Sequence, residues 1–143
     1  MVSISLVTRQ QQTILFIGGG AVAERRLRPF LDEPCQILVI SPIVTNAIRE
    51  WAEQGKLEWR DVAFTSEVGR DIINFHESCQ LVFACTDSSE VNEEVAGWAR
   101  KHHFLVNRSD RMDDCDFTVP STLTIGDIHL AISANSVGPR INK

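Results

Sequence analysis

A continuous apolar run at residues 14–17 leads directly into a glycine-rich turn, Gly18-x-Gly20-x-x-Ala23. Such a run predicts a buried strand of a parallel sheet, and the small residues after it predict a tight turn into a helix. Gly18 allows the backbone to turn sharply, Gly20 leaves room for a pyrophosphate, and Ala23 lets the helix lie close to the sheet. The stretch therefore predicts the first unit of a dinucleotide-binding fold, with a merely tight turn as the alternative.

The helix after this turn is predicted to face the sheet with apolar residues and the solvent with arginines. Pro29 removes one backbone hydrogen bond, so we expect a distortion near Arg25 and an end to the helix before Pro34. The predicted inward residues are Val22, Leu27, Phe30 and Leu31, and the predicted outward residues are Arg25, Arg26 and Arg28.

Apolar segments and helical patterns then alternate, which is typical of an α/β protein. We predict strands over residues 37–40, 57–62, 81–85 and 104–106, and helices over residues 44–54 and 66–75 and after Asp87. Asp87 and Glu90 have the spacing of a helix cap. Residues 2–8 are expected to be a lead-in or an edge strand. Residues 1–115 are therefore predicted to form an NAD-binding, Rossmann-like doubly wound parallel sheet.

The pattern changes after residue 115. Residues 122–125 and 128–133 alternate on either side of Gly126-Asp127, which predicts a β-hairpin with an exposed edge. We therefore expect residues 116–143 to form a C-terminal β-hairpin dimerisation element, so that the protein is a homodimer. The apolar positions expected to need cover are Phe117, Val119, Ile128 and Leu130.

Composition narrows the range of partners. The 143 residues carry a net charge of −5, so the overall field attracts neither a nucleic acid nor an anionic membrane. The four cysteines have neither zinc-site spacing nor the pattern of a disulfide framework, which favours a reduced, cytoplasmic protein without a metal site. No apolar run is long enough to cross a membrane. We expect no nucleic-acid and no membrane partner.

Two further turns are candidates for ligand contacts, because open α/β sheets bind ligands at the carboxyl ends of their strands. The second core strand ends at Ser41-Pro42, without the acidic residue that usually holds a ribose, so the sequence does not separate NAD from NADP. The strand at residues 81–85 ends at Thr86 and Asp87. For Asp87, a plain helix cap is the alternative.

The chain resembles the precorrin-2 dehydrogenase and sirohydrochlorin ferrochelatase family, the NAD-binding N-terminal part of siroheme synthases. The resemblance covers nearly the whole chain in four stretches. They are residues 15–25 (LFIGGGAVAER), residues 84–87 (ACTD) with Val91-Asn92, residues 106–110 (VNRSD) with residues 116–121 (DFTVPS), and residues 131–133 (AIS) with Pro139.

The resemblance implies NAD-dependent oxidation of precorrin-2 to sirohydrochlorin and, in bifunctional members, insertion of ferrous iron. The cofactor contacts that it implies fall on Ala21, Val22, Pro42 and Ile43. The family's important aspartate matches Asp110, which suits a proton acceptor. From the residues alone, the alternative is that Asp110 only shapes its loop with Ser109 and Asp113.

Charge adds an expectation about the substrate. A chain at −5 must bind a polycarboxylate tetrapyrrole through local cations. We therefore expect Asn107, Arg108 and Arg111 to frame the substrate beside Asp110, with both arginines keeping that carboxylate ionised.

Two departures from the family make metal insertion less expected than cofactor binding. Residues 133–139 differ from the family's SSGGTSP run, and the sequence ends at Lys143, where relatives continue into a helical segment. Three functions stay open: the dehydrogenase, a non-catalytic NAD(H)-binding sensor or scaffold, and a homodimeric partner protein with a vestigial pocket. Asp110, the hairpin and the missing acidic residue after the second core strand favour the dehydrogenase.

Overall fold

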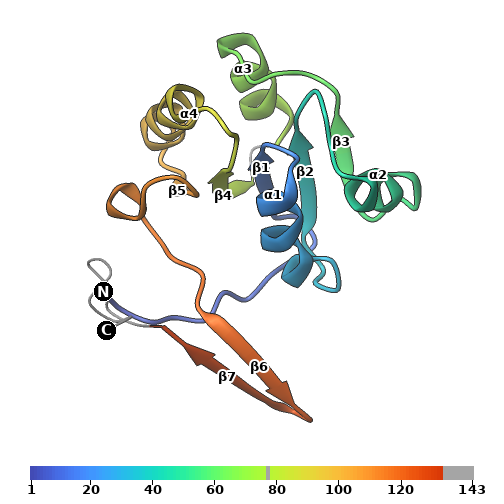
Figure 1. The fold of residues 1–143 in the computed structure, drawn as a ribbon, viewed down its shortest axis with the longest axis vertical. Helices are drawn as coiled ribbons and strands as arrows, with labels where there is room; N and C mark the ends of the chain where they lie inside the picture. The colour runs from blue at the N-terminus through green and yellow to red at the C-terminus, as the bar shows by residue number, and fades with distance from the viewer. Residues whose placement is uncertain (77, 134–143) are drawn as a thin grey trace.

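One open parallel sheet organises the chain. A computed structural model describes residues 1–76 and 78–133, and within them five parallel strands pair in the order β3-β2-β1-β4-β5 (Figure 1). The order reverses at β1, which leaves a switch point between β1 and β4, where such sheets bind ligands. The strands are β1 (Thr13–Ile17), β2 (Gln36–Ile40), β3 (Glu58–Arg60), β4 (Cys79–Ala84) and β5 (Leu105–Arg108).

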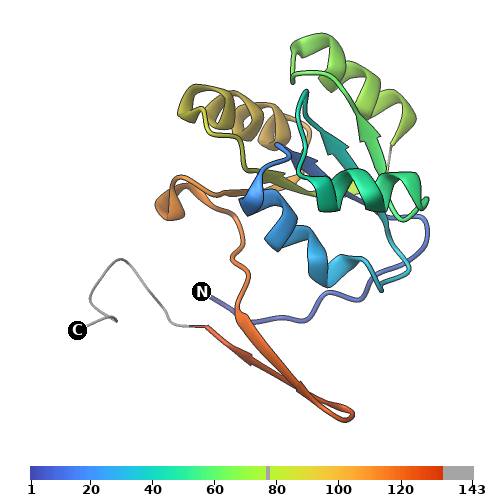
Figure 2. The same cartoon turned by 45° about the vertical axis from the view of Figure 1, so that its right-hand side comes forward.

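Helices cover both faces of the sheet (Figures 1 and 2). The first two helices pack on one face through Leu27 and Ile48, and the last two pack on the other through Ile72 and Val95. This arrangement confirms the predicted doubly wound α/β fold. The helices are α1 (Ala21–Leu27), α2 (Asn46–Glu53), α3 (Ser66–Phe75) and α4 (Ser89–Lys101), with short 3-10 turns η1 (Arg28–Phe30) and η2 (Met112–Asp114).

The central strand β1 is apolar along its whole length because both of its faces are covered. Leu15 and Ile17 belong to the core under α3 and α4, whereas Ile14 and Phe16 belong to the core under α1 and α2. Successive side chains of a strand point to opposite faces, so a strand buried on both sides has a continuous apolar sequence. Phe16 stacks on Phe83 of β4 with ring centroids 4.6 Å apart.

The first helix differs from its prediction in two ways. It has no distortion near Arg25. Instead, the α-helical part ends at Leu27 and Pro29 lies in η1, because proline cannot donate the hydrogen bond that a helix interior needs. Arg26 does not lie on the solvent side. It is partly buried, and its Nη1 donates to Oδ1 of Asn107 at 2.6 Å.

A hairpin projects from the sheet domain, as predicted (Figure 1). It consists of β6 (Ser121–Ile125) and β7 (Ile128–Ile132), which are antiparallel and joined by a turn in which Gly126 has a φ of 58°. The register places the large apolar side chains on one face, together with Ser121, and Thr122, Thr124 and His129 on the other. The apolar face consists of Leu123, Ile125, Ile128, Leu130 and Ile132, all exposed.

The segment before the hairpin packs on the sheet domain. The ring of Phe117 meets that of Phe83 edge to face, with ring centroids 5.2 Å apart, so the expectation that Phe117 needs cover from elsewhere is wrong.

At the other end of the chain, residues 1–12 form a lead-in without a strand. This extended segment passes the base of the hairpin, where Thr118 Oγ1 lies 3.8 Å from Met1 Sδ (Figures 1 and 2). No helix in the described part of the chain is long and apolar enough to cross a membrane.

Candidate dinucleotide site

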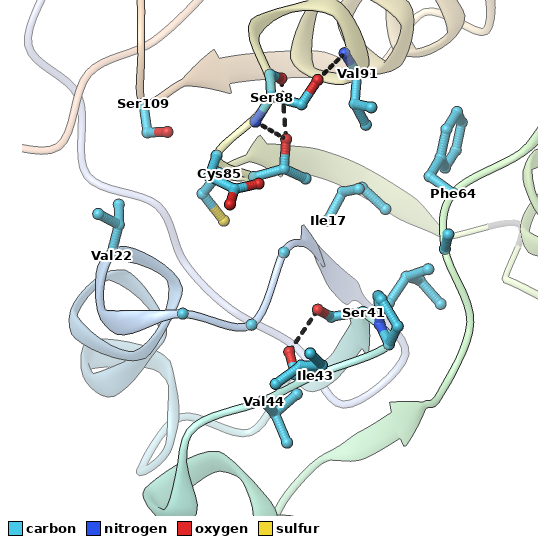
Figure 3. A pocket seen from close by; sticks show the side chains of 18 of the residues that line it. Ile17, Val22, Ser41, Ile43, Val44, Phe64, Cys85, Ser88, Val91 and Ser109 are labelled. Atoms are coloured by element: carbon cyan, nitrogen blue, oxygen red, sulfur yellow. Dashed lines mark hydrogen bonds between the residues drawn. The ribbon is translucent and has the colours of Figure 1, made fainter.

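A pocket of about 680 Å³ opens where the chain leaves β1, β2 and β4 (Figure 3). Its volume lies within the range of roughly 300–1,000 Å³ that is typical of small-molecule sites. Three turns that are distant in the sequence meet there, at the switch point of the sheet. The residues predicted to contact the cofactor all line it: Gly18, Gly20, Ala21, Val22, Ser41, Pro42, Ile43, Thr86 and Asp87.

The three glycines of the first turn have different roles. Gly18 has a φ of 122°, and a Cβ there would lie 2.5 Å from the carbonyl oxygen of Cys85, so only glycine allows β1 and β4 to end so close together. A Cβ on Gly19 would lie 2.6 Å from the carbonyl oxygen of Ile43. A Cβ on Gly20 would meet nothing within 4 Å. Gly20 therefore borders open space in the pocket, where a ligand can approach the backbone.

The amino end of α1 is not capped by a side chain. Its N-cap is Gly20, whereas the hydroxyls of Thr45, Thr65 and Ser88 accept backbone hydrogen bonds at the starts of α2, α3 and α4. The first N–H groups of α1 are consequently left for solvent or a ligand. The uncapped turn, the open space at Gly20 and the pocket volume together fit the diphosphate of a dinucleotide.

The turn after β2 is held by two hydrogen bonds from side chains to its backbone. The Ser41 side chain is buried, and its hydroxyl donates to the carbonyl oxygen of Ile43 at 2.6 Å. The carbonyl oxygen of Ser41 accepts from Nε1 of Trp59 at 2.8 Å. Ile43 is 78% exposed. The hydroxyl of Ser41 therefore shapes the pocket wall, and Pro42 and Ile43 form its outer rim.

The turn after β4 is fixed by a residue of α4. Asn92 is fully buried, and its Oδ1 accepts from the hydroxyl of Thr86 at 2.7 Å and from the backbone N–H of Thr86 at 3.0 Å. The cap of α4 is Ser88, whose Oγ accepts from Val91 N at 3.3 Å. The predicted capping role of Asp87 is therefore wrong by one residue. Asp87 is exposed at the pocket instead.

Asp110 follows β5 and lies just outside the pocket, which Ser109 lines. Arg108 donates to both carboxylate oxygens of Asp110, from Nε to Oδ1 at 3.1 Å and from Nη2 to Oδ2 at 2.9 Å. These hydrogen bonds lower the pKa of Asp110 to about 2, although partial burial acts in the opposite direction. Asp110 is therefore ionised at neutral pH.

The chain's own carboxylates hold both arginines that were expected to frame a substrate. Arg108 has a side chain only 2% exposed, and its Nη1 also donates to Asp114 Oδ2 at 2.8 Å. Arg111 pairs with Asp113 at 2.7 Å. Of the two arginines expected to keep Asp110 ionised, Arg108 contacts it directly and Arg111 pairs elsewhere.

Asn107 connects three parts of the fold. It is buried in β5, accepts from Arg26 of α1, and donates from Nδ2 to the carbonyl oxygen of Phe117 at 2.9 Å. The residues predicted to bind the substrate or to accept its proton do not line the pocket but adjoin it through Ser109. They are Asn107, Arg108, Asp110 and Arg111.

Sequence reasoning missed three residues of this region. Gly19 was given no role between two functional glycines, although a Cβ there would lie 2.6 Å from the backbone of the turn after β2. Asn92 stands among apolar residues on the inner face of α4, and a buried amide there was a detectable signal, because buried polar groups need partners. Arg26 carried no such signal, since its partner Asn107 is 81 residues away.

Comparison with known proteins agrees with this geometry. Residues 6–121 match the model of a family described as "Putative NAD(P)-binding". The chain is 33% identical over 129 residues to a siroheme synthase of Nitrosococcus oceani, covering 90% of this chain and 26% of that one. It is 30% identical over 132 residues to a precorrin-2 dehydrogenase of Priestia megaterium, covering 92% of this chain and 61% of that one.

A solved structure is also similar. SirC, a precorrin-2 dehydrogenase, superposes with a TM-score of 0.80 at 27% sequence identity, over 99% of this chain and 65% of that one. The chain thus spans about a quarter of the siroheme synthase and about three fifths of the Priestia megaterium dehydrogenase. These findings confirm the resemblance stated from the sequence. The chain belongs to the NAD(P)-binding family that its residues 6–121 match, together with relatives among siroheme synthases and precorrin-2 dehydrogenases.

Proposed function

We propose that this chain binds NAD and oxidises precorrin-2 to sirohydrochlorin in siroheme synthesis. One observation supports this most strongly: a pocket that fits a dinucleotide lies, through Ser109, next to an ionised carboxylate, Asp110. Among the relatives, the names precorrin-2 dehydrogenase and siroheme synthase give the substrate class. Metal insertion is not part of the proposal.

The glycine turn and the β4 turn have separate tasks in this proposal. Gly20 admits the diphosphate to the backbone of α1, and Asp87 faces the pocket from the opposite turn. When bound, NAD supplies the acceptor for the two electrons that leave the tetrapyrrole. The Asn92 contacts to Thr86 keep the β4 turn in place, so the pocket is preformed.

Asp110 accepts the proton that leaves the tetrapyrrole. A carboxylate with a pKa near 2 is a weak base, but it is ionised over the whole physiological range. It therefore suits a substrate whose proton becomes acidic as the electrons depart. Arg108 acts through Asp110 as a positioning residue, because its guanidinium is enclosed and faces carboxylates of the chain.

The hairpin, in this proposal, pairs two copies of the chain. Its apolar face is exposed, with Ile132 at 71% and Leu130 at 46%. A contiguous apolar surface of this kind is typical of an interface. We accordingly treat residues 1–115 as the cofactor-binding unit and residues 116–133 as a dimer element; the predicted extension over residues 134–143 lies outside the described residues. The four free cysteines accord with a cytoplasmic location.

Titration with NAD and with NADP tests the proposal against its alternatives. We expect saturable binding of NAD, followed by calorimetry, and binding of sirohydrochlorin by the same protein. A sensor or scaffold would bind the dinucleotide without the tetrapyrrole. A partner protein with a vestigial pocket would bind neither, and that result would remove the proposed function.

A further inference from the structure

A tetrapyrrole with several carboxylates needs cations near Asp110, and the two arginines expected to supply them have other partners. Arg108 is enclosed between Asp110 and Asp114, and Arg111 is paired with Asp113. The pairs around Arg108 leave little of its guanidinium for a ligand, whereas the Arg111 side chain is 54% exposed. A substrate with several carboxylates would therefore gain from a further cation in this region.

Arg26 has no carboxylate partner among the described residues. Its Nη1 donates to Asn107 Oδ1 at 2.6 Å, its Nε is buried without a hydrogen-bond partner, and it takes part in none of the ion pairs of residues 1–76 and 78–133. A partly buried guanidinium with an unpaired N–H is costly, since desolvation is not offset by an opposite charge. An anion bound beside it would offset that cost.

Arg26 lies one helical turn from a residue of the pocket wall and contacts β5. One helical turn earlier on α1, Val22 lines the dinucleotide pocket and points toward Cys85 and Ser109 (Figure 3). Burial raises the pKa of Cys85 to about 12 and the charge of Arg26 opposes this shift, so the guanidinium lies near the end of β4. Its partner Asn107 is on β5, two residues before Ser109, which lines the pocket.

We propose that Arg26 binds a carboxylate of the tetrapyrrole in the wall between α1 and β5. This inference rests on the proposed function and adds a residue to its substrate site. Asn107 orients the guanidinium, because its own amide nitrogen Nδ2 donates to the carbonyl oxygen of Phe117 and so fixes the side chain. The enclosed Nε leaves the charge poorly solvated, which strengthens the attraction of the guanidinium for an anion.

The diphosphate of the dinucleotide is a less suitable partner for this arginine. Gly20 and Arg26 are separated by six residues, about 9 Å along the helix axis. Arg26 also does not line the pocket. A substrate that extends from the pocket past Ser109 toward Asp110 would lie near Asn107, which holds the guanidinium.

The test compares Arg26→Gln with Arg25→Gln, its exposed neighbour on the same helix. Sirohydrochlorin is titrated into each protein and followed by absorbance, and NAD is titrated separately by calorimetry. We expect Arg26→Gln to weaken sirohydrochlorin binding about ten- to a hundredfold, the worth of one hydrogen bond to a charged group. Arg25→Gln should bind both ligands normally, and Arg26→Lys should recover part of the loss.

A measurement on the unaltered protein is independent of any folding defect. The Nε–Hε resonance of Arg26 should shift when sirohydrochlorin is added and should stay in place with NAD alone. Normal sirohydrochlorin affinity in a folded Arg26→Gln would overturn the inference and leave the proposed function standing. A loss of NAD affinity equal to the loss of sirohydrochlorin affinity would assign Arg26 to the cofactor instead. A wild-type protein that binds no sirohydrochlorin would overturn both.

Discussion

Arg108 holds both carboxylate oxygens of Asp110 in a fork, with Nε to Oδ1 at 3.1 Å and Nη2 to Oδ2 at 2.9 Å. The same guanidinium reaches Asp114 at 2.8 Å, and Nη2 lies 3.4 Å from both oxygens of Ser89 at the start of α4. The fork fixes the direction of the carboxylate as well as its charge. Asp110 is thus a preset group rather than a mobile loop side chain.

Replacing Arg108 tests this relationship. In Arg108→Gln we expect the pKa of Asp110 to rise from about 2 toward the ordinary value of 3.8, because the hydrogen bonds from Arg108 are the largest cause of the shift. Carbon-13 NMR titration of the Asp110 carboxyl measures this pKa. Arg111→Gln is the control, since Arg111 pairs with Asp113, and it should leave the Asp110 titration unchanged. Unfolding free energy should also fall, by less than the roughly 3–5 kcal/mol of a fully buried pair. An unshifted titration in Arg108→Gln would show that the fork does not set the charge of Asp110.

The lowered pKa of Asp110 also predicts how stability depends on pH. A carboxylate whose pKa is lower in the folded chain stabilises the fold above the unfolded pKa, and this contribution is lost as pH falls through the folded pKa. The difference in unfolding free energy between wild type and Asp110→Asn should be constant above about pH 5 and shrink steadily toward about pH 2. Urea unfolding across this range measures it. A difference that does not change with pH is incompatible with the ion pair.

The glycines of the first turn should separate folding from binding. A Cβ at position 19 meets backbone of the neighbouring turn at 2.6 Å, so Gly19→Ala should lower the unfolding free energy by about 1–3 kcal/mol. Gly20→Val should leave stability near wild type, since nothing lies within 4 Å, and should abolish NAD binding because its side chain enters the pocket. Thermal unfolding and calorimetry measure the two effects. Unchanged NAD affinity in Gly20→Val would remove the glycine turn from the binding site.

The two faces of the hairpin provide a matched pair for the dimer. Leu123 lies on its exposed apolar face, and Thr124 points to the opposite side. We expect Leu123→Lys to convert a homodimer to a monomer in sedimentation at micromolar concentration, whereas Thr124→Lys should remain dimeric. A wild-type chain that sediments as a monomer at this concentration would count against the hairpin as a dimer element.

The fold could be predicted from the sequence because its strongest signals are local. The apolar run of β1 and the glycines after it determine the strand, the turn and the start of α1 within a few residues. The same local signals brought the predicted cofactor residues to one pocket, because parallel strands end at one edge of a sheet. The boundaries were less predictable, as Ser88 rather than Asp87 at the start of α4 illustrates.

The partners of the charged residues in the site could not be predicted, because they depend on tertiary contacts between elements that are distant in the sequence. Whether Arg108 faces a ligand or Asp110 depends on how α4 and η2 enclose it, and these elements come together only in the folded chain. Arg26 was expected in solvent with Arg25 and Arg28 because charged side chains are mostly exposed. Its contact with β5 depends on how closely α1 lies on the sheet.

Anaerobic turnover of precorrin-2 with NAD tests the central claim most directly. The wild-type chain should form one NADH for each sirohydrochlorin, both followed by absorbance. Asp110→Asn should lose about 10²–10⁴-fold in rate while NAD affinity stays near wild type, because the variant keeps the shape of the side chain and deletes the proton acceptor. Asp113→Asn, with a side chain 70% exposed, should turn over normally. No NADH from the wild-type chain, or a normal rate in Asp110→Asn, would contradict the account.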